Sequence, residues 1–274
     1  MKRSPYSAYK AWLKRAWHPV LLKPAQPMSW TSCLRLHEAS STEIPALRSR
    51  RDTTRHDTTQ HGLSSDVIDI PHYRHHAQAY ATATRDVDMA PLYARFVPLL
   101  PAGGRVLDVG CGSGRDALAF AQRGYQVTAF DASPELAQLA AQHTGLPVAT
   151  ANVLHLQGPG SLGLPPHTRF DGIWACASLL HLPEADQARA WQALWALLAP
   201  GGVAYASYKL GDDAQPSERV DTLGRPFTDA TEARVARWLS GLPEVAQIST
   251  WVTTDQRPAE GQAWLNMLVQ RRQH

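Results

Sequence analysis

The stretch Val106-Leu-Asp-Val-Gly-Cys-Gly-Ser-Gly114 decides the fold of this chain. Its apolar, β-branched run predicts a buried strand, and the glycines at alternate positions predict a tight turn directly after it. Residues 115–121 (RDALAFA) have the spacing of an amphipathic helix, which Gly124 ends in the left-handed capping position. Glycines let backbone approach a ligand, and a helix N-terminus offers unpaired N–H groups. The unit therefore predicts a site for a nucleoside-like molecule.

The spacing of the glycines separates two kinds of nucleoside ligand. Dinucleotide sites use G-x-G-x-x-G, whereas Gly110, Gly112 and Gly114 form G-x-G-x-G, with Arg115 where the third dinucleotide glycine would stand. A dinucleotide also places its pyrophosphate on the helix N-terminus. Asp108, just before the turn, would repel a pyrophosphate and instead suits a positively charged ligand.

The same stretch resembles the first motif of class I S-adenosylmethionine-dependent methyltransferases. In that family the loop wraps the amino-acid end of S-adenosyl-L-methionine, a cofactor that carries no phosphate. The resemblance implies that residues of the strand end and the turn bind this cofactor: Asp108, Gly110, Cys111, Gly112, Gly114 and Arg115.

An acidic residue ends the second predicted strand, residues 124–131 (GYQVTAFD). Asp131 lies about 20 residues past the first glycine, the distance at which a Rossmann-like unit presents a carboxylate to ribose hydroxyls. A carboxylate accepts two charge-assisted hydrogen bonds from the vicinal diol. We therefore assign Asp131 and the adjacent Ala132 to the cofactor. The alternative is a solvated strand-end acid that binds no ligand.

The third predicted strand departs from the family at its end. Methyltransferases of this class often have an acid here that accepts a hydrogen bond from the adenine amino group, whereas this chain has Asn152. An amide oxygen can accept the same bond, and the Val153 N–H could donate to the adenine ring. We therefore include both residues in the cofactor site.

The order of the later segments adds to the resemblance. Residues 169–178 predict the fourth strand, and Leu179-Leu-His181, a helix, Leu-Ala-Pro-Gly-Gly and a strand at 203–208 follow. Five segments in the family's order over about 105 residues are far more specific than a lone glycine loop. The resemblance also assigns Ala175, in the fourth strand, to the cofactor site.

The C-terminal part completes the expected sheet. Residues 208–227 lack a regular pattern, residues 228–239 predict a helix, and residues 245–254 and 263–270 predict two closing strands. We expect an α/β fold, with a Rossmann-like, seven-stranded, mostly parallel sheet, an antiparallel last strand and helices on both faces. Ligands of such sheets bind at the carboxyl ends of the strands.

Charge divides the 274 residues unevenly. Residues 1–62 hold 11 Lys/Arg and 4 Asp/Glu (net +7), and the remainder holds 16 and 20 (net −4), so the mildly acidic part lacks the basic face of a nucleic-acid binder. The polar composition predicts a disordered basic extension over 1–62. Three interpretations of this extension are open: an arm that binds nucleic acid or a membrane surface, a targeting peptide, or an extension without a specific role. The methyltransferase domain is expected over 63–274, with lid helices at 63–100, a cofactor-binding core at 101–210 and a C-terminal helix and hairpin at 211–274.

Composition limits the compartment and the partners. No apolar run is long enough to cross a membrane, and three cysteines without metal-ligand spacing favour a reducing, cytoplasmic setting. His75 and His76 lack an acidic partner, so we expect no metal site. We expect a small-molecule methyl acceptor and no membrane, with nucleic acid a minor alternative. The sequence does not indicate the oligomeric state.

His181 is the candidate general base, because it follows the fourth strand and a histidine is mostly neutral at physiological pH. The alternative is a loop histidine that packs against the cofactor or caps a helix. Tyr208 and Lys209 end the fifth strand and point towards the same edge, and the alternative is a strand-end polar pair in water. Arg225 is a candidate for binding an anionic substrate, and the alternative is a residue of a surface turn.

In the family, helices before the glycine loop cover the cofactor, and a tyrosine of the leading helix often reaches it. Tyr80 is the candidate, because its ring face would attract a sulfonium. Tyr73, His75 and His76 are further candidates on the same segment.

Three functions fit these observations. From Tyr73 onward the chain resembles small-molecule methyltransferases of the bacterial tellurite-resistance-like group. A module that binds S-adenosylmethionine without transferring methyl groups would have the same cofactor residues. An RNA or DNA methyltransferase would use the basic extension as an electrostatic arm.

Overall fold

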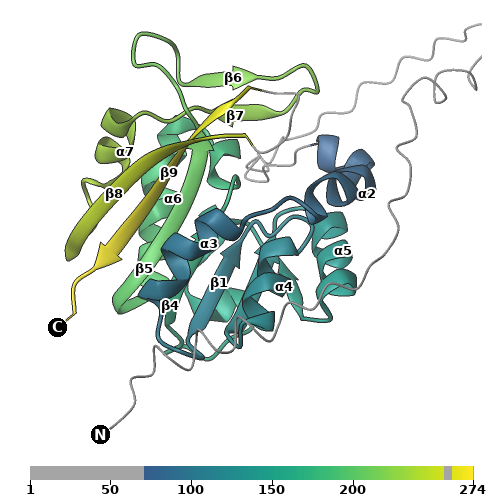
Figure 1. Cartoon of the computed structure of the whole chain (residues 1–274), viewed down its shortest axis with the longest axis vertical. Coiled ribbons are helices and arrows are strands. Elements are labelled where there is room, and N and C mark those ends of the chain that lie inside the picture. Colours follow the sequence, from purple (N-terminus) through teal and green to yellow (C-terminus); the bar gives the residue numbers. More distant parts are fainter. Residues whose placement is uncertain (1–70, 256–260, 274) are drawn as a thin grey trace, which may run out of the picture. The chain divides into compact units, whose positions relative to one another are not determined.

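The computed structural model describes residues 71–255 and 261–273, and the predicted extension over 1–62 lies outside these ranges. A seven-stranded sheet forms the centre of this part, with the strand order β3-β2-β1-β4-β5-β9-β8 (Figure 1). Its strands span β1 (Arg105–Val109), β2 (Gln126–Asp131), β3 (Val148–Thr150), β4 (Phe170–Ala175), β5 (Leu198–Lys209), β8 (Val245–Thr254) and β9 (Ala263–Arg271).

The directions of the strands confirm the predicted fold class. Strands β1 to β5 pair in parallel, whereas β9 runs antiparallel to β5 and pairs antiparallel with β8. The last strand in sequence therefore inserts between β5 and β8. This arrangement brings the ends of β5, β8 and β9 together at one edge, because Lys209 and Thr253 both pair with Trp264.

Helices cover both faces of the sheet, as predicted. The main ones are α2 (Pro71–Arg85), α3 (Ala90–Phe96), α4 (Arg115–Gln122), α5 (Pro134–Thr144), α6 (Glu184–Leu197) and α7 (Glu232–Leu239). Single-turn 3₁₀ helices lie at η2 (Val97–Leu99), η3 (Val153–His155), η4 (Pro159–Leu162) and η5 (Leu179–His181). The predicted lid helices are α2 and α3, and in Figure 1 α3, α4 and α5 lie on one side of the sheet and α6 and α7 on the other.

Side-chain alternation along the strands explains the two layers, because successive residues point to opposite faces. Val106 and Trp174 belong to a buried cluster with Phe120 of α4. Their neighbours Leu107 and Ile173 belong to the cluster that contains α6 and α7. A strand buried on both faces needs apolar residues at almost every position, and β1 meets this requirement except at the exposed Arg105 and the buried Asp108.

The segment after β5 differs from the prediction of an irregular stretch. An antiparallel pair, β6 (Glu218–Val220) and β7 (Pro226–Thr228), lies beyond the end of β5. An Asp221–Arg225 ion pair at 2.7 Å closes the turn between the two strands. Three-residue strands lack a periodic signal, so pattern analysis missed this hairpin.

Within the described residues, no helix combines the length and apolarity needed to cross a membrane.

Candidate cofactor and acceptor site

Two cavities lie side by side at the carboxyl ends of the parallel strands. The larger cavity, of about 600 Å³, is bounded by the ends of β1, β2 and β3. The smaller cavity, of about 180 Å³, is bounded by the ends of β4, β5 and β9 and by β7. The wall that they share consists of Tyr73, Tyr80, Gly110, Gly112, Ala177 and His181.

The glycine turn after β1 requires glycine for two reasons. Gly110, Gly112 and Gly114 all have positive φ, at 63°, 55° and 77°. A Cβ on Gly110 would lie 2.6 Å from the Cβ of Ser178, and one on Gly114 would lie 2.7 Å from the Cγ2 of Thr144. At these two positions glycine allows the turn to pack against protein. Gly110 and Gly112 also lie at the wall that the two cavities share.

Asp131 holds this turn against the end of β2. Its Oδ2 accepts a hydrogen bond from the Gly112 N–H at 2.8 Å, and its Oδ1 accepts one from the Ser133 N–H at 2.9 Å. Burial raises the pKa of this carboxyl to about 6, against the opposing effect of these hydrogen bonds. Asp131 and the adjacent Ala132 both line the larger cavity.

Three predicted residues lie behind the cavities. These are Asp108, Gly114 and Ala175, none of which lines either cavity. Asp108 is buried on the face of β1 that α4 covers, and Ala175 packs into the core. The Oδ2 of Asp108 has no hydrogen-bond partner among the described residues. Burial and then the charge of Asp116 raise the pKa of Asp108 well above its usual range. Asp108 contacts neither cavity directly.

Asn152 and Val153 line the larger cavity, as predicted. The side-chain oxygen of Asn152 accepts a hydrogen bond from the Leu154 N–H at 2.9 Å and so caps η3. This contact orients the amide and occupies one lone pair of the oxygen, which leaves one acceptor position for a ligand.

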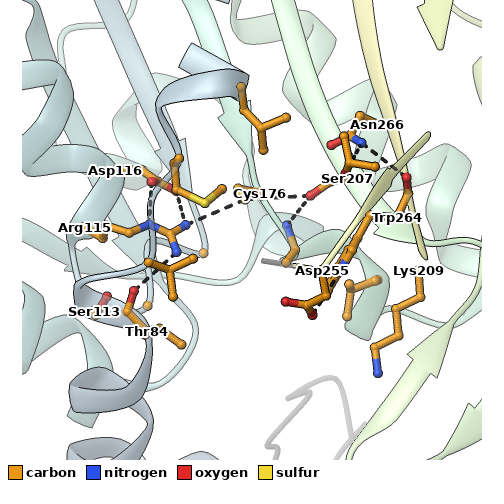
Figure 2. Close-up of a pocket in the computed structure, with 18 of the residues that line it drawn as sticks. Thr84, Ser113, Arg115, Asp116, Cys176, Ser207, Lys209, Asp255, Trp264 and Asn266 are labelled. Atoms are coloured by element: carbon orange, nitrogen blue, oxygen red, sulfur yellow. Dashed lines mark hydrogen bonds and ion pairs between the residues drawn. The ribbon is translucent and has the colours of Figure 1, made fainter. Parts of the chain in front are cut away.

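Arg115 and Asp116 form an ion pair at the start of α4, in which Asp116 is buried and Arg115 is partly buried. The guanidinium donates to both carboxylate oxygens at 2.8 Å, and Trp174 Nε1 and the Tyr93 hydroxyl also donate to Asp116. Burial alone would raise the pKa of Asp116, but these contacts outweigh it and lower the pKa. Arg115 lines the smaller cavity and also donates to the Thr84 carbonyl of α2 (Figure 2).

Sequence analysis missed Asp116. An acid in the first turn of a helix is ordinarily explained by the helix dipole, and Trp174 lies far away in the sequence. The one available signal was an arginine–aspartate pair directly after the glycines.

His181 occupies the shared wall on η5. Its Nδ1 faces the Pro226 carbonyl at 2.8 Å and its Nε2 faces the Tyr73 hydroxyl at 3.1 Å. A carbonyl only accepts, so Nδ1 carries the proton and Nε2 accepts from Tyr73. Burial lowers the pKa of His181 to about 4, and the nearby cation Arg225 contributes in the same direction. These contacts favour a positioning role over the predicted role as a base.

A buried glutamine that sequence analysis missed fixes the η5 turn. Gln187 of α6 donates to the carbonyls of Leu179 and Leu182 at 2.8 and 3.1 Å, one on each side of His181. Its oxygen accepts from the Tyr208 hydroxyl at 2.8 Å. Strand alternation turns the buried Tyr208 toward α6, whereas Lys209 lines the smaller cavity, so these two neighbours do not face the same side.

Helix α2 contributes two tyrosines to the shared wall. Tyr80, predicted to contact the cofactor, packs edge-on against Tyr73 with ring centroids 4.9 Å apart. His75 and His76 are exposed and line neither cavity. No group of three or more His, Cys, Asp or Glu side chains in the described part of the chain is arranged to hold a metal ion.

The far wall of the smaller cavity comes from β5, β8 and β9 (Figure 2). Ser207 accepts from the Ala177 N–H at 2.9 Å, and Asn266 accepts from the Tyr205 hydroxyl at 2.7 Å. Trp264 donates through Nε1 to Asp255 at 3.2 Å. Of this wall, sequence analysis found only Lys209, because single polar residues in strands show no pattern.

A family model described as the methyltransferase domain matches residues 73–259. This range includes all the predicted site residues and the lining of both cavities except Trp264 and Asn266 of β9. The chain belongs to the methyltransferase domain family.

Relatives of this methyltransferase domain include a ubiquinone biosynthesis O-methyltransferase of Xanthomonas axonopodis pv. citri (strain 306). It is 38% identical over 109 residues, which make up 40% of this chain and 44% of the relative. The match therefore spans less than half the length of that protein.

Two solved structures are also similar. The first is the Burkholderia thailandensis 1,6-didemethyltoxoflavin-N1-methyltransferase with bound 1,6-didemethyltoxoflavin and S-adenosylhomocysteine, at a TM-score of 0.57 and 26% identity over 78% of this chain and 93% of that one. The second is a TehB-like methyltransferase from Corynebacterium glutamicum ATCC 13032, at a TM-score of 0.54 and 16% identity over 74% of this chain and 100% of that one. The second likeness shows the fold alone, so membership of the tellurite-resistance-like group stays a prediction.

Asp116→Ala should destabilise the methyltransferase domain by about 3–5 kcal/mol, because it leaves the partly buried Arg115 guanidinium without its counter-charge. Urea unfolding followed by tryptophan fluorescence measures the change. Asp186→Ala, which breaks an exposed ion pair with Arg189, is the matched control and should change stability by at most about 1 kcal/mol. Equal losses in the two variants would contradict the structural role of Asp116.

Because His181 is neutral in the folded state, we predict that the free energy of unfolding of the domain falls in acid. The folded-state pKa is depressed to about 4 from 6.5, so this contribution is fully present above pH 6.5 and is lost as the pH falls toward 4. The loss amounts to roughly 3 kcal/mol when complete. Urea unfolding between pH 7 and pH 4 should show a smaller loss in His181→Gln than in the wild type. The exposed His167, changed to Gln, is the control, and identical profiles for all three proteins would refute the prediction.

Proposed function

We propose that this chain is an S-adenosyl-L-methionine-dependent methyltransferase that acts on a small-molecule acceptor. The observation that carries the proposal is the pair of adjoining cavities, one beside the glycine turn and Asp131 and the other beyond the wall that contains Tyr80 and His181. A methyl group bound at this wall would face an acceptor in the smaller cavity.

The charges around the turn fit a cationic cofactor. Asp108, Asp116 and Asp131 are all buried within or beside the strand–turn–helix unit, so a pyrophosphate would meet several carboxylates and only one guanidinium. The Asp108 Oδ2 without a partner favours the positive amino-acid end of the proposed cofactor. A ligand cation there would favour the ionised form of Asp108, whose pKa burial raises.

The remaining cofactor contacts follow the order of the strands. In this proposal Asp131 accepts hydrogen bonds from the ribose diol, and Asn152 and Val153 hold the adenine beside Ala132. Gly110, Cys111, Gly112 and Arg115 enclose the amino-acid end, and the ring of Tyr80 faces the sulfonium.

The cofactor supplies the methyl group when bound, and this chain supplies positioning. Aligning two reactants can contribute about 7–11 kcal/mol to lowering a barrier, so no catalytic side chain is obligatory. Tyr73 and His181 join α2 to η5 and so hold the lid helix over the reacting groups and exclude water. Gln187 fixes the turn that carries His181.

Several observations support a small acceptor. The smaller cavity is bounded by Trp264, Phe227 and α2, and its volume suits a small ring compound rather than a polymer. The related structure with 26% identity contains bound 1,6-didemethyltoxoflavin. The net charge of −4 from residue 63 onward opposes a polynucleotide.

Turnover separates this proposal from a module that only binds the cofactor. Purified protein, methyl-labelled cofactor and a panel of phenols, thiols and amines should yield a labelled small product. Calorimetry with S-adenosylhomocysteine should show binding. Binding without product on any acceptor would favour the binding module, and salt-sensitive labelling of RNA or DNA that is lost on removal of residues 1–62 would favour the nucleic-acid alternative.

Asp131→Asn should weaken binding of S-adenosylhomocysteine by about tenfold or more, because it removes charge-assisted hydrogen bonds. Calorimetry at pH 7.5 measures the dissociation constant. Asp171→Asn is the matched control, since this strand-end acid accepts from the Arg105 N–H at the opposite end of the sheet. Unchanged affinity in Asp131→Asn would remove Asp131 from the site.

Affinity for S-adenosylhomocysteine should also depend on pH through Asp131. The pKa of about 6 means that the carboxylate is ionised above pH 7 and protonated below pH 5, so affinity should fall as the pH is lowered through 6. Binding should weaken by about tenfold per pH unit below this pKa. Asp131→Asn should lack this dependence, and a wild-type profile without a slope between pH 7.5 and 5 would contradict the prediction.

A further inference from the structure

Cations gather around one aromatic ring at the smaller cavity. The Nζ of Lys209 lies 3.8 Å from the ring centroid of Phe227, and the guanidinium carbons of Arg219 and Arg225 each lie 5.3 Å from it. Arg219 pairs with Asp229 and Arg225 pairs with Asp221, both outside the cavity lining. Lys209, Arg225 and Phe227 line the cavity, and Arg219 does not.

Three acids also line this cavity. Asp116 is paired with Arg115, and Asp255 accepts from the indole of Trp264. Asp88 accepts from the Ala90 N–H at the start of α3. The side of the cavity formed by β5 and β7 is therefore its cationic side, and it adjoins the shared wall at His181.

Burial, assisted by these cations, keeps His181 neutral near neutral pH. The groups facing the imidazole are Tyr73 from α2, Lys209 from β5, and Arg225 and Asp221 from the β6–β7 turn. Burial, and then Arg225 and Lys209, lower the pKa of His181, against the opposing effects of the Pro226 carbonyl and Asp221. Its Nε2 lone pair already accepts from Tyr73, whose own pKa burial raises. Neither His181 nor Tyr73 is therefore suited to take a proton from the methyl acceptor.

The positions of Lys209 and Arg225 beside Phe227 favour an anion at this side of the cavity. A cation within about 4–6 Å lowers the pKa of an acid by about 1–3 units. An acidic hydroxyl beside Lys209 and Arg225 would therefore lose its proton to solvent on binding and would need no base. The aromatic rings of Phe227 and Trp264 suit a planar ring that carries this hydroxyl.

We propose that the acceptor is a hydroxyl-bearing aromatic compound that binds in the smaller cavity as its phenolate, beside Lys209 and Arg225. This inference rests on the proposed methyltransferase function. In the transfer, the phenolate oxygen forms a bond to the methyl carbon and the carbon–sulfur bond breaks. Its electron pair stays on the sulfur, so the sulfonium and phenolate charges cancel and no proton moves in this step.

The test is the ionisation state of a bound chromophore. We would titrate 4-nitrophenol and 4-nitrocatechol into the protein saturated with S-adenosylhomocysteine and follow the phenolate absorption band from pH 5 to pH 9. The pKa of the bound phenol should fall by about one unit or more. Lys209→Gln should weaken phenolate binding about tenfold and abolish most of the shift, and Arg219→Gln, the matched cation outside the cavity, should leave both unchanged.

Two further measurements decide between the outcomes. 4-Nitroaniline, the matched ligand without an acidic hydroxyl, should bind equally to the wild type and Lys209→Gln. The rate of phenol methylation should follow ionisation of the acceptor, with the same pH profile in His181→Asn. A bound phenol whose pKa is unchanged or raised, failure of both phenols to bind, or equal effects of Lys209→Gln and Arg219→Gln would each overturn the inference. If S-adenosylhomocysteine itself does not bind, the proposed function fails instead.

Discussion

The hydrogen bond from the Gly112 N–H to the Asp131 carboxylate joins the glycine turn after β1 to the end of β2. The site depends on this contact, because the turn has positive φ at three glycines and gains its orientation from packing and from Asp131. Beside it, the Cys111 N–H donates to the Phe130 carbonyl at 3.0 Å. The two contacts fix both the floor of the larger cavity and the wall that it shares with the smaller one.

Buried carboxylates give this region its chemical character. Asp116 remains ionised because Arg115 and two further donor groups, on Tyr93 and Trp174, stabilise its charge. Asp108 and Asp131 lack a cationic partner of this kind, and burial raises the pKa of both. A bound cation would therefore stabilise the ionised carboxylates of the strand–turn–helix unit. The cationic side of the smaller cavity has the opposite preference, which suits a reaction between a sulfonium and an anion.

Short-range patterns allowed most of the fold and the cofactor side of the site to be predicted. The apolar runs of β1 and β4, the glycine spacing and the acid that ends β2 are each visible within a few consecutive residues. The larger cavity is accordingly lined by four residues that sequence analysis assigned to the cofactor: Asp131, Ala132, Asn152 and Val153. Tyr80, found through the family resemblance, lies at the shared wall.

The rest depends on contacts between distant segments, which a single sequence does not encode in a readable pattern. Asp116 and Trp174 are 58 residues apart, and Tyr73 and His181 are 108 apart. The pKa of His181 depends on burial by these segments, so its role could not be derived from the ordinary pKa of a histidine. Whether a strand-end residue such as Tyr208 faces a cavity or a helix depends on strand register, which the motifs leave open.

A crystal structure of the protein grown with S-adenosylhomocysteine tests the central claim most directly. The account predicts the ribose diol on Asp131, the adenine between Ala132 and Asn152, and the sulfur at the wall formed by Tyr80 and His181. Electron density for the compound elsewhere, or a ribose that makes no contact with Asp131, would contradict it.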